Sequence, residues 1–333
     1  MGVAKEFVKI GDEYAAQERW ETALALYNEA IKRYPELANA YFRRGVVYET
    51  LEKYYQARED FDKAIHLGLE HAEIYFHRGY TLYRIMWGIK EFALKDYDKA
   101  IRLDPDHAEA HYWRGILWYE AKYHQSAVDD FTKVIQLNPD NDAAYSSRGC
   151  AYYAMFQSED AIADFTHVIN RNRYEEMCLV YYNRAIAYQL DEQYTLAIQD
   201  YADAIRIKPD FSEALSGRLE LYEKIGAIQK AIEDATALIT LEPDNVSWYL
   251  KRGQIYERIG EYHKAVADLT EVIRRSENFP DAHLRRAGVY LKLGMYDKAI
   301  ADYDNIINHA HFEHVKQEAR DKKEAAIRLK INS

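Results

Sequence analysis

Apolar and polar positions along the chain follow one arrangement that recurs over nearly its whole length. Its clearest marker is an alanine that is followed, four residues later, by an aromatic residue in most copies. Most copies are 34 residues apart, as Ala23 and Ala57 are. The marker alanines are Ala23, Ala57, Ala93, Ala127, Ala161, Ala197, Ala231, Ala265 and Ala299. Apolar positions three or four residues apart share one face of an α-helix, so the pattern predicts a chain of helices.

A second marker lies upstream of most of these alanines: a glycine with a bulky residue three positions after it. The glycines are Gly11, Gly45, Gly79, Gly115, Gly149 and Gly253, and the bulky residues are Tyr14, Tyr48, Leu82, Trp118, Tyr152 and Tyr256. A small residue lets a second helix approach closely, and we expect the bulky residue to fill the space beside it. Prolines such as Pro35 and Pro105 would end the second helix, because proline cannot donate a hydrogen bond to the preceding turn. Each copy therefore predicts two packed helices.

Nine copies of this pattern resemble the tetratricopeptide repeat family, whose unit is a pair of antiparallel helices. The resemblance implies an all-α fold, a right-handed superhelical solenoid of about nine helix hairpins whose first helices line a concave groove. The expected solenoid covers residues 4–313, and residues 314–333 are expected to form a C-terminal capping helix with a thin apolar stripe. The nine expected units are 4–37, 38–71, 72–107, 108–141, 142–177, 178–211, 212–245, 246–279 and 280–313.

Three units depart from the common pattern. The third has extra residues within 81–92, and the fifth has extra residues within 169–178. The seventh carries Leu219 and Ala235 in place of the glycine and the aromatic residue. We expect each departure to change the superhelix locally.

Every unit except the first also carries an arginine directly before the small residue and an aspartate directly before the second bulky position. The first unit has Ile10 and Leu26 at these positions, so it lacks both charges together. One interpretation is a row of arginines that binds phosphate or acidic peptides. We favour arginine–aspartate bridges within each unit, because a half-buried charge without a partner is costly. The predicted pairs are Arg44 with Asp60, Arg78 with Asp96, Arg114 with Asp130, Arg148 with Asp164, Arg184 with Asp200, Arg218 with Asp234, Arg252 with Asp268 and Arg286 with Asp302.

The stretch HYWRGILWYE, residues 111–120, carries four large rings on one predicted first helix. The repeat places Trp118 in the core and leaves Tyr112, Trp113 and Tyr119 on the other side. In the tetratricopeptide family these offsets face the groove, and rings contribute much of the binding energy at protein interfaces. The resemblance thus implies a partner-binding groove that contains Phe76, Tyr80, Tyr83, Arg84, Tyr112, Trp113, Ile116, Tyr119, Tyr153, Tyr182, Asn183 and Ile186.

Two interpretations of these rings stay open from the sequence. They bind a peptide segment or a helix of a partner protein, or they pack on one another without a ligand. The corresponding functions are a non-enzymatic interaction scaffold and a self-assembling, homo-oligomeric scaffold. A third hypothesis is an enzyme or a regulatory subunit with a small-ligand pocket among Tyr112, Ser146, Ser147 and Tyr182.

Composition narrows the classes of partner. The chain has 333 residues and a net charge of −11, which disfavours nucleic acid and anionic membranes as partners. No apolar run approaches the roughly 18 residues of a membrane span. The start, MGVAKEFVKI, lacks the apolar core of a signal peptide. A cytoplasmic protein is the expectation, and a mature chain whose signal has been removed is the open alternative.

Sequence signatures of catalysis are missing from the chain. It contains no GxxxxGK[ST], GxGxxG, GxSxG or HExxH motif, so we predict no enzyme, no catalytic residue and no cofactor. Cys150 and Cys178 have no metal-ligand spacing, and we expect both to be reduced. We expect His309, His311 and His314 to form an exposed polar turn rather than a metal site.

Overall fold

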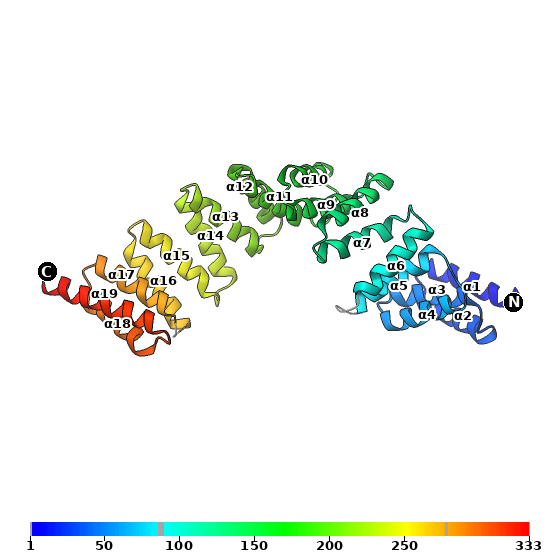
Figure 1. Cartoon of the computed structure of the whole chain (residues 1–333), viewed down its shortest axis with the longest axis horizontal. Helices are drawn as coiled ribbons and strands as arrows, with labels where there is room; N and C mark the ends of the chain where they lie inside the picture. The colour runs from blue at the N-terminus through cyan, green and yellow to red at the C-terminus, as the bar shows by residue number, and fades with distance from the viewer. Residues whose placement is uncertain (1, 86–89, 277–278, 333) are drawn as a thin grey trace. The chain divides into compact units, whose positions relative to one another are not determined.

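Nineteen α-helices make up the described part of the chain, which contains no strand (Figure 1). The structure, a computed structural model, describes residues 2–85, 90–276 and 279–332. Within these ranges, no helix has the length and the apolar character needed to cross a lipid bilayer. The prediction of an all-α fold is confirmed. The helices are α1 (Gly2–Ala15), α2 (Trp20–Arg33), α3 (Ala38–Thr50), α4 (Tyr54–His66), α5 (Ala72–Ile85), α6 (Lys90–Leu103), α7 (Ala108–Glu120), α8 (His124–Leu137), α9 (Asp142–Ala154), α10 (Ser158–Arg171), α11 (Met177–Leu190), α12 (Tyr194–Ile207), α13 (Ser212–Lys224), α14 (Ile228–Leu241), α15 (Val246–Arg258), α16 (Tyr262–Arg275), α17 (Pro280–Lys292), α18 (Tyr296–His309) and α19 (Glu313–Ile331).

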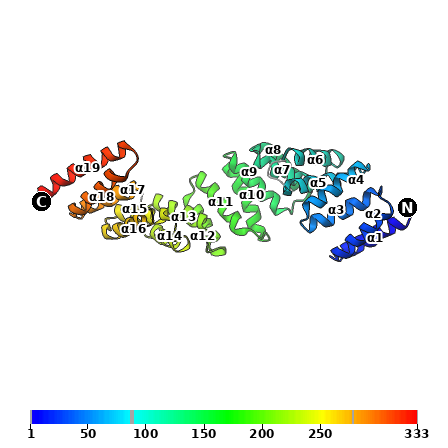
Figure 2. The same ribbon diagram turned by 90° about the horizontal axis from the view of Figure 1, so that it is seen from below.

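Contacts between residues divide the chain into two compact parts. We call them the N-terminal block, Met1–Tyr174, and the C-terminal block, Glu175–Ser333. In each block consecutive helices pair into hairpins, from α1 with α2 to α17 with α18, and the hairpins follow one another in chain order (Figure 2). Within a block, each second helix also packs on the first helix of the next hairpin. A first helix inside a block is therefore packed on two sides.

First helices of neighbouring hairpins also touch one another in the N-terminal block. Helix α1 contacts α3, α3 contacts α5, α5 contacts α7, and α7 contacts α9. Side chains from successive first helices therefore meet on one surface. We call the surface formed by the first helices of a block its inner face.

The core of each N-terminal hairpin joins a glycine of the first helix to a ring of the second. A Cβ atom at these glycines would lie 2.5–3.0 Å from the ring, whereas carbon atoms pack at about 3.5 Å or more. The predicted role of the small residue is confirmed, because only glycine admits the ring at this distance. The pairs are Gly11 with Tyr27, Gly45 with Phe61, Gly79 with Tyr97, Gly115 with Phe131 and Gly149 with Phe165.

One assignment made from the sequence holds only in part. Trp118, predicted to be a core residue, packs against the core cluster that contains Phe131. It is only half-buried, however, and its ring stands edge-on to the exposed Tyr123 at 5.5 Å. The adjacent Leu117 is buried instead, in one cluster with Leu82 of the preceding hairpin. Gly115 faces its own hairpin, and Leu117, about 200° further round the helix, faces the preceding one. The equivalent residues, all buried, are Val47, Thr81, Leu117, Ala151, Ala187, Leu221, Ile255 and Val289.

The three departures from the repeat have different outcomes. Part of the extra sequence in the third unit, residues 86–89, lies outside the described residues. In the fifth unit, α10 ends at Arg171, and the next residue, Asn172, has the left-handed conformation (φ 50°). Helix α11 begins at Met177, and the boundary between the blocks falls in this segment. In the seventh unit, Leu219 and Ala235 are both buried, so the large residue lies on the first helix and the small one on the second.

The C-terminal helix α19 packs on α18, the last helix of the hairpin series. Its apolar stripe contributes Val315, Ala319 and Ala326 to that contact. Lys323 of α19 pairs with Asp304 of α18 at 2.6 Å. The predicted C-terminal helix is thus present, with its apolar stripe turned toward the last hairpin.

Candidate functional site

The arginine–aspartate pairs connect the two helices of each hairpin that carries them. Arg148, for example, donates to Asp164 from Nε and Nη2, both at 2.8 Å. Burial raises the pKa of Asp200, and the hydrogen bonds from Arg184 oppose that rise. We call these residues the ladder arginines and ladder aspartates. All eight predicted pairs form through two nitrogen atoms, which confirms their structural role: Arg44–Asp60, Arg78–Asp96, Arg114–Asp130, Arg148–Asp164, Arg184–Asp200, Arg218–Asp234, Arg252–Asp268 and Arg286–Asp302.

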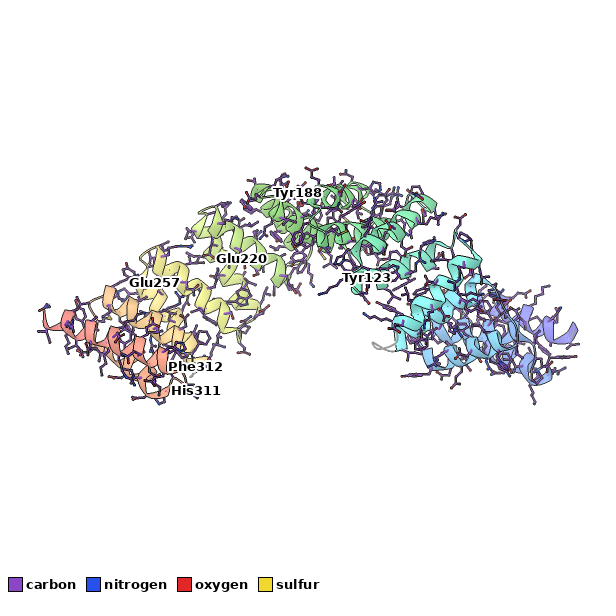
Figure 3. The ribbon with its side chains drawn as sticks, viewed as in Figure 1. Tyr123, Tyr188, Glu220, Glu257, His311 and Phe312 are labelled. Atoms are coloured by element: carbon purple, nitrogen blue, oxygen red, sulfur yellow. The ribbon has the colours of Figure 1, made fainter. Side chains whose placement is uncertain are left out.

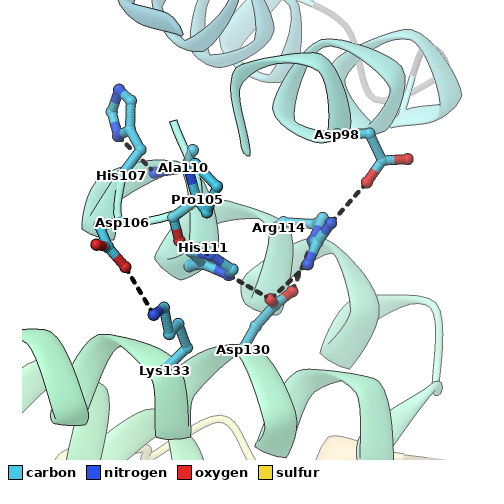
Figure 4. Close-up of polar contacts among 9 residues, drawn as sticks. All are labelled: Asp98, Pro105, Asp106, His107, Ala110, His111, Arg114, Asp130 and Lys133. Atoms are coloured by element: carbon cyan, nitrogen blue, oxygen red, sulfur yellow. Dashed lines mark hydrogen bonds and ion pairs between the residues drawn. The ribbon is translucent and has the colours of Figure 1, made fainter. Parts of the chain in front are cut away.

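A third guanidinium nitrogen links several ladder arginines to the preceding hairpin. Figure 4 shows Arg114 between Asp130 of its own hairpin and Asp98 of the preceding one, to which Nη1 donates at 2.7 Å. Nδ1 of His111 lies 2.8 Å from the same Asp130 carboxylate. Arg148 makes the equivalent link to Thr132 at 3.0 Å. The ladder therefore joins successive hairpins as well as the two helices within each one.

Five predicted groove residues form one continuous group of rings on the inner face of the N-terminal block. Phe76, Tyr80 and Tyr83 come from α5, and Tyr112 and Trp113 come from α7. We call them the ring cluster. The Trp113 ring lies 4.9 Å from that of Tyr80, 5.5 Å from that of Tyr83 and 5.7 Å from that of Tyr112. The Phe76 ring stacks on that of Tyr80 with their centres 6.4 Å apart. All five side chains are half-buried, so the rings pack on one another and still retain surface exposed to solvent.

Polar groups border the ring cluster. The Tyr83 hydroxyl donates to Glu120 at 3.0 Å, and Lys90 pairs with the same carboxylate at 2.7 Å. Arg84 is exposed and donates from Nη1 to the Tyr80 hydroxyl at 2.9 Å. Burial and the bond to Glu120 raise the pKa of Tyr83 to about 12, so its hydroxyl stays protonated at neutral pH. Sequence reasoning missed Lys90, because the residue lies on a second helix and no groove offset of the family includes it.

The remaining predicted residues of the N-terminal block lie toward α9. The Tyr112 hydroxyl is 3.3 Å from Oγ of Ser147 on α9. Ile116 and Tyr119 pack partly against the core of their own hairpin, and Tyr153 is exposed. A shallow cavity of about 190 Å³ lies beside Tyr112. Nine of the twelve predicted groove residues are thus on first helices of one block.

The other three predicted groove residues lie on α11 in the C-terminal block. Tyr182, Asn183 and Ile186 are half-buried. The Tyr182 ring lies 4.9 Å from that of Phe211 and 5.9 Å from that of Tyr201. Tyr182 therefore packs within its own block.

The histidine and cysteine residues singled out from the sequence have the following surroundings. In the described part of the chain, no group of three or more histidine, cysteine, aspartate or glutamate residues is placed to hold a metal ion. Nδ1 of His309 lies 2.9 Å from the backbone oxygen of Asn305. Cys150 and Cys178 form no disulfide and are half-buried, and burial raises the pKa of Cys150 to about 11. The inner face offers rings, hydroxyl groups and paired charges, and aromatic residues are enriched at protein interfaces.

Tandem hairpins with a small residue opposite a ring define a helical repeat protein. Sequence profiles described as TPR repeat match residues 11–52 and 91–122. Profiles described as tetratricopeptide repeat match residues 38–67, 108–141, 180–211, 217–275 and 250–308. The chain belongs to the tetratricopeptide repeat family. A comparison with curated proteins gives no match.

Solved structures show the same fold. The chain is similar to a tetratricopeptide repeat protein from Parabacteroides merdae, with 19% identity and a TM-score of 0.51 over 77% of this chain and 98% of that one. It is also similar to the C-terminal part of a TPR repeat-containing protein from Cytophaga hutchinsonii. That match has 18% identity and a TM-score of 0.51 over 83% of this chain and 97% of the other. At these identities the similarity concerns the fold alone.

Proposed function

We propose that the chain is a scaffold that binds a peptide segment or a helix of a partner protein on its inner face, at the ring cluster. Membership of the tetratricopeptide repeat family supports a protein-interaction scaffold in general terms. The finer proposal rests on one observation: five half-buried rings from two hairpins lie in contact on one surface.

The ring cluster combines the properties of an interface centre. Aromatic side chains bury a large area on binding, and they lose little conformational entropy because few of their bonds rotate. Mutual packing holds these rings in place before a partner arrives, which lowers the entropic cost of association. Glu120 and the exposed Arg84 stand at the border, where polar groups select partners by charge and hydrogen bonding.

The partner segment would present an apolar or aromatic side chain to Trp113 and a polar group to Arg84 or Glu120. We propose Tyr182, Asn183 and Ile186 as a separate set of partner contacts within the C-terminal block. An asparagine amide both donates and accepts, so Asn183 is suited to bind the backbone of a peptide.

The test compares two tryptophans of α7 that differ in their surroundings. Peptides would be selected on the wild-type chain from a phage library of short random sequences, and their affinities measured by fluorescence anisotropy. We expect Trp113→Ala to weaken the selected peptides by about tenfold or more, because truncation of an interface hot spot costs 2 kcal/mol or more. Trp118→Ala, the matched control, should leave affinity within about twofold.

Equal affinities for wild type and Trp113→Ala, with the circular dichroism spectrum unchanged, would reject the ring cluster as the binding site. Light scattering on the same samples tests the alternative of self-assembly. If the wild type forms oligomers that Trp113→Ala dissolves, the cluster binds a second copy of the chain instead of a foreign peptide.

A further inference from the structure

Most ladder arginines lie under a tyrosine of their own helix. The tyrosine stands one helical turn after the arginine, and its ring faces the guanidinium at 5.5–5.9 Å. Tyr188, labelled in Figure 3, is one of them. Six hairpins share this arrangement: Arg44 with Tyr48, Arg148 with Tyr152, Arg184 with Tyr188, Arg218 with Tyr222, Arg252 with Tyr256 and Arg286 with Tyr290.

The third hairpin lacks this ring, because Leu82 stands where the tyrosine would be. A cavity of about 250 Å³ lies there, lined by Leu82 and Arg78 of α5 and by residues of α4 and α6. Phe92, one of the α6 residues, is 58% exposed. Arg78 does lie over the ring of Tyr75, which precedes it on α5, at 5.7 Å, so only the tyrosine one turn after it is missing. Arg78 and Arg114, which both lack that second tyrosine, have 23% and 22% of their side chains exposed, compared with 14–19% for the six that have it.

We propose that this cavity binds an aromatic side chain, of the tyrosine type, from an acidic segment of a partner protein. The chain itself shows which group suits the position, since it places a tyrosine ring over the same arginine–aspartate pair in six other hairpins. A guanidinium has a flat face on which an aromatic ring stacks. Leu82 supplies an apolar floor and Phe92 an aromatic wall, so a ring in the cavity contacts apolar surface on two sides.

Charge at the cavity favours an acidic partner. Its lining has three cations, Arg58, Arg78 and Lys95, against two carboxylates, Asp62 and Asp96. Both carboxylates already accept hydrogen bonds from Arg78. Acidic residues beside the incoming ring would therefore meet a local excess of positive charge on a chain whose net charge is −11.

The cavity and the ring cluster lie on different sides of α5. Arg78 and Leu82 are one turn apart, whereas Tyr80 is roughly 160° away from Leu82 around the helix. Leu82 also belongs to the core cluster against which Phe76, Tyr83 and Trp113 pack. An occupant of the cavity still need not touch the solvent-exposed side of the ring cluster, so the two proposals can be tested separately.

The probe is the capped peptide Glu-Asp-Tyr-Glu-Asp, with Glu-Asp-Ala-Glu-Asp as its matched control. NMR titration would follow the Arg78 Nε–H signal, which a stacked ring should shift by its ring current. We expect a saturable shift with the tyrosine peptide and none with the alanine peptide. Trp113→Ala should leave this binding unchanged, which separates the outcome from that at the ring cluster.

Three further variants complete the test. Leu82→Tyr should abolish binding, because the chain then fills its own cavity. Phe92→Ala, at an exposed position, should weaken binding roughly tenfold by removing one wall. Leu196→Ala, the residue of the sixth unit that precedes the marker alanine as Phe92 does, should leave binding unchanged.

Equal binding of the alanine peptide, or undiminished binding by Leu82→Tyr, would overturn the proposal.

Discussion

The inner faces of the two blocks are both formed by first helices, but the contacts between those helices differ. In the N-terminal block, rings of the ring cluster join α5 to α7, and polar pairs join the earlier first helices, Arg43 with Asp12 and His77 with Glu49. In the C-terminal block, ion pairs join the first helices: Lys251 and Arg258 with Glu223 at 2.7 and 3.0 Å, and Lys292 with Glu257 at 2.9 Å. The ladder is the same in both blocks. Residues only one or two positions from the ladder residues differ from one repeat to the next. The packing framework and the chemistry of the inner face therefore depend on different positions of the repeat.

The cores of the two blocks also differ. Every N-terminal hairpin uses a glycine against a ring, whereas the C-terminal hairpins use other combinations of sizes. Gly253 faces Leu269, and Leu219 lies opposite Ala235. A Cβ atom at Gly253 would be 3.3 Å from its nearest neighbour, compared with 2.8 Å at Gly115. The N-terminal core is therefore the tighter of the two at this position.

The largest effect should be common to both blocks. Asp164→Ala and Asp268→Ala each leave a partly buried arginine without its carboxylate, and we expect each to lower the free energy of unfolding by about 3 kcal/mol. The two sites are matched, since Arg148 and Arg252 each also bind a threonine of the preceding hairpin. Urea unfolding of both variants measures the loss. A clearly smaller effect in one block would show that the ladder does not stabilise the two blocks equally.

A smaller effect should separate the blocks. Gly115→Ala forces a methyl group against the buried Phe131 ring and should cost about 1–3 kcal/mol, as overpacking does. Gly253→Ala has more room, and alanine favours a helix over glycine by about 1 kcal/mol. Thermal melts should therefore move in opposite directions, or Gly253→Ala should leave the melting temperature unchanged. Equal destabilisation by both changes would contradict the difference in packing.

The turns between paired helices provide a third comparison. Phe156 has a positive φ of 60° and is 80% exposed, whereas Gly226 occupies the equivalent position with φ 77°. Left-handed backbone costs a residue with a side chain about 1 kcal/mol. Phe156→Gly should thus raise the free energy of unfolding by about that amount, and Gly226→Ala should lower it. Urea unfolding of the two variants tests the opposite signs.

The smallest effect concerns the one cysteine in each block. Burial raises the pKa of Cys150 from 9.0 to about 11. Between these two pH values the Cys150 thiol keeps its proton in the folded chain and loses it in the unfolded chain. Stability from Cys150 is therefore present below pH 9 and lost as pH rises toward 11. Alkylation by iodoacetamide should be slow at pH 8 and accelerate near pH 11, with Cys178 as the internal reference. Cys150→Ala should reduce the dependence of stability on pH in this range, to which half-buried tyrosines with a raised pKa, such as Tyr119, also contribute, and an unaltered dependence would contradict the assignment.

The fold could be predicted from the sequence because spacing alone identifies it. The glycine, the alanine and the aromatic residue recur at fixed offsets. The ladder pairs could be predicted because the first unit lacks both the arginine and the aspartate. Trp118 packs against the core as predicted but is not fully buried, because periodicity locates a helix face, whereas burial depends on which neighbours cover it. The ring cluster was found as a set of residues, but its contacts and its partner Lys90 depend on helix placement. The cavity beside Leu82 could not be predicted from the sequence. A leucine at a position where other repeats have tyrosine does not show whether the space beside it is filled.

The third nitrogen of the ladder arginines has a consequence for how such a chain can grow or shrink. Each such guanidinium binds groups of its own hairpin and of the hairpin before it. The smallest unit that can be exchanged without loss of these contacts is therefore a complete hairpin. Adding or deleting whole hairpins leaves each arginine beside an equivalent neighbour. A cut between the two helices of a hairpin instead separates the ladder arginine from its aspartate. Grafts between chains of this kind should therefore be joined at the connections that follow second helices.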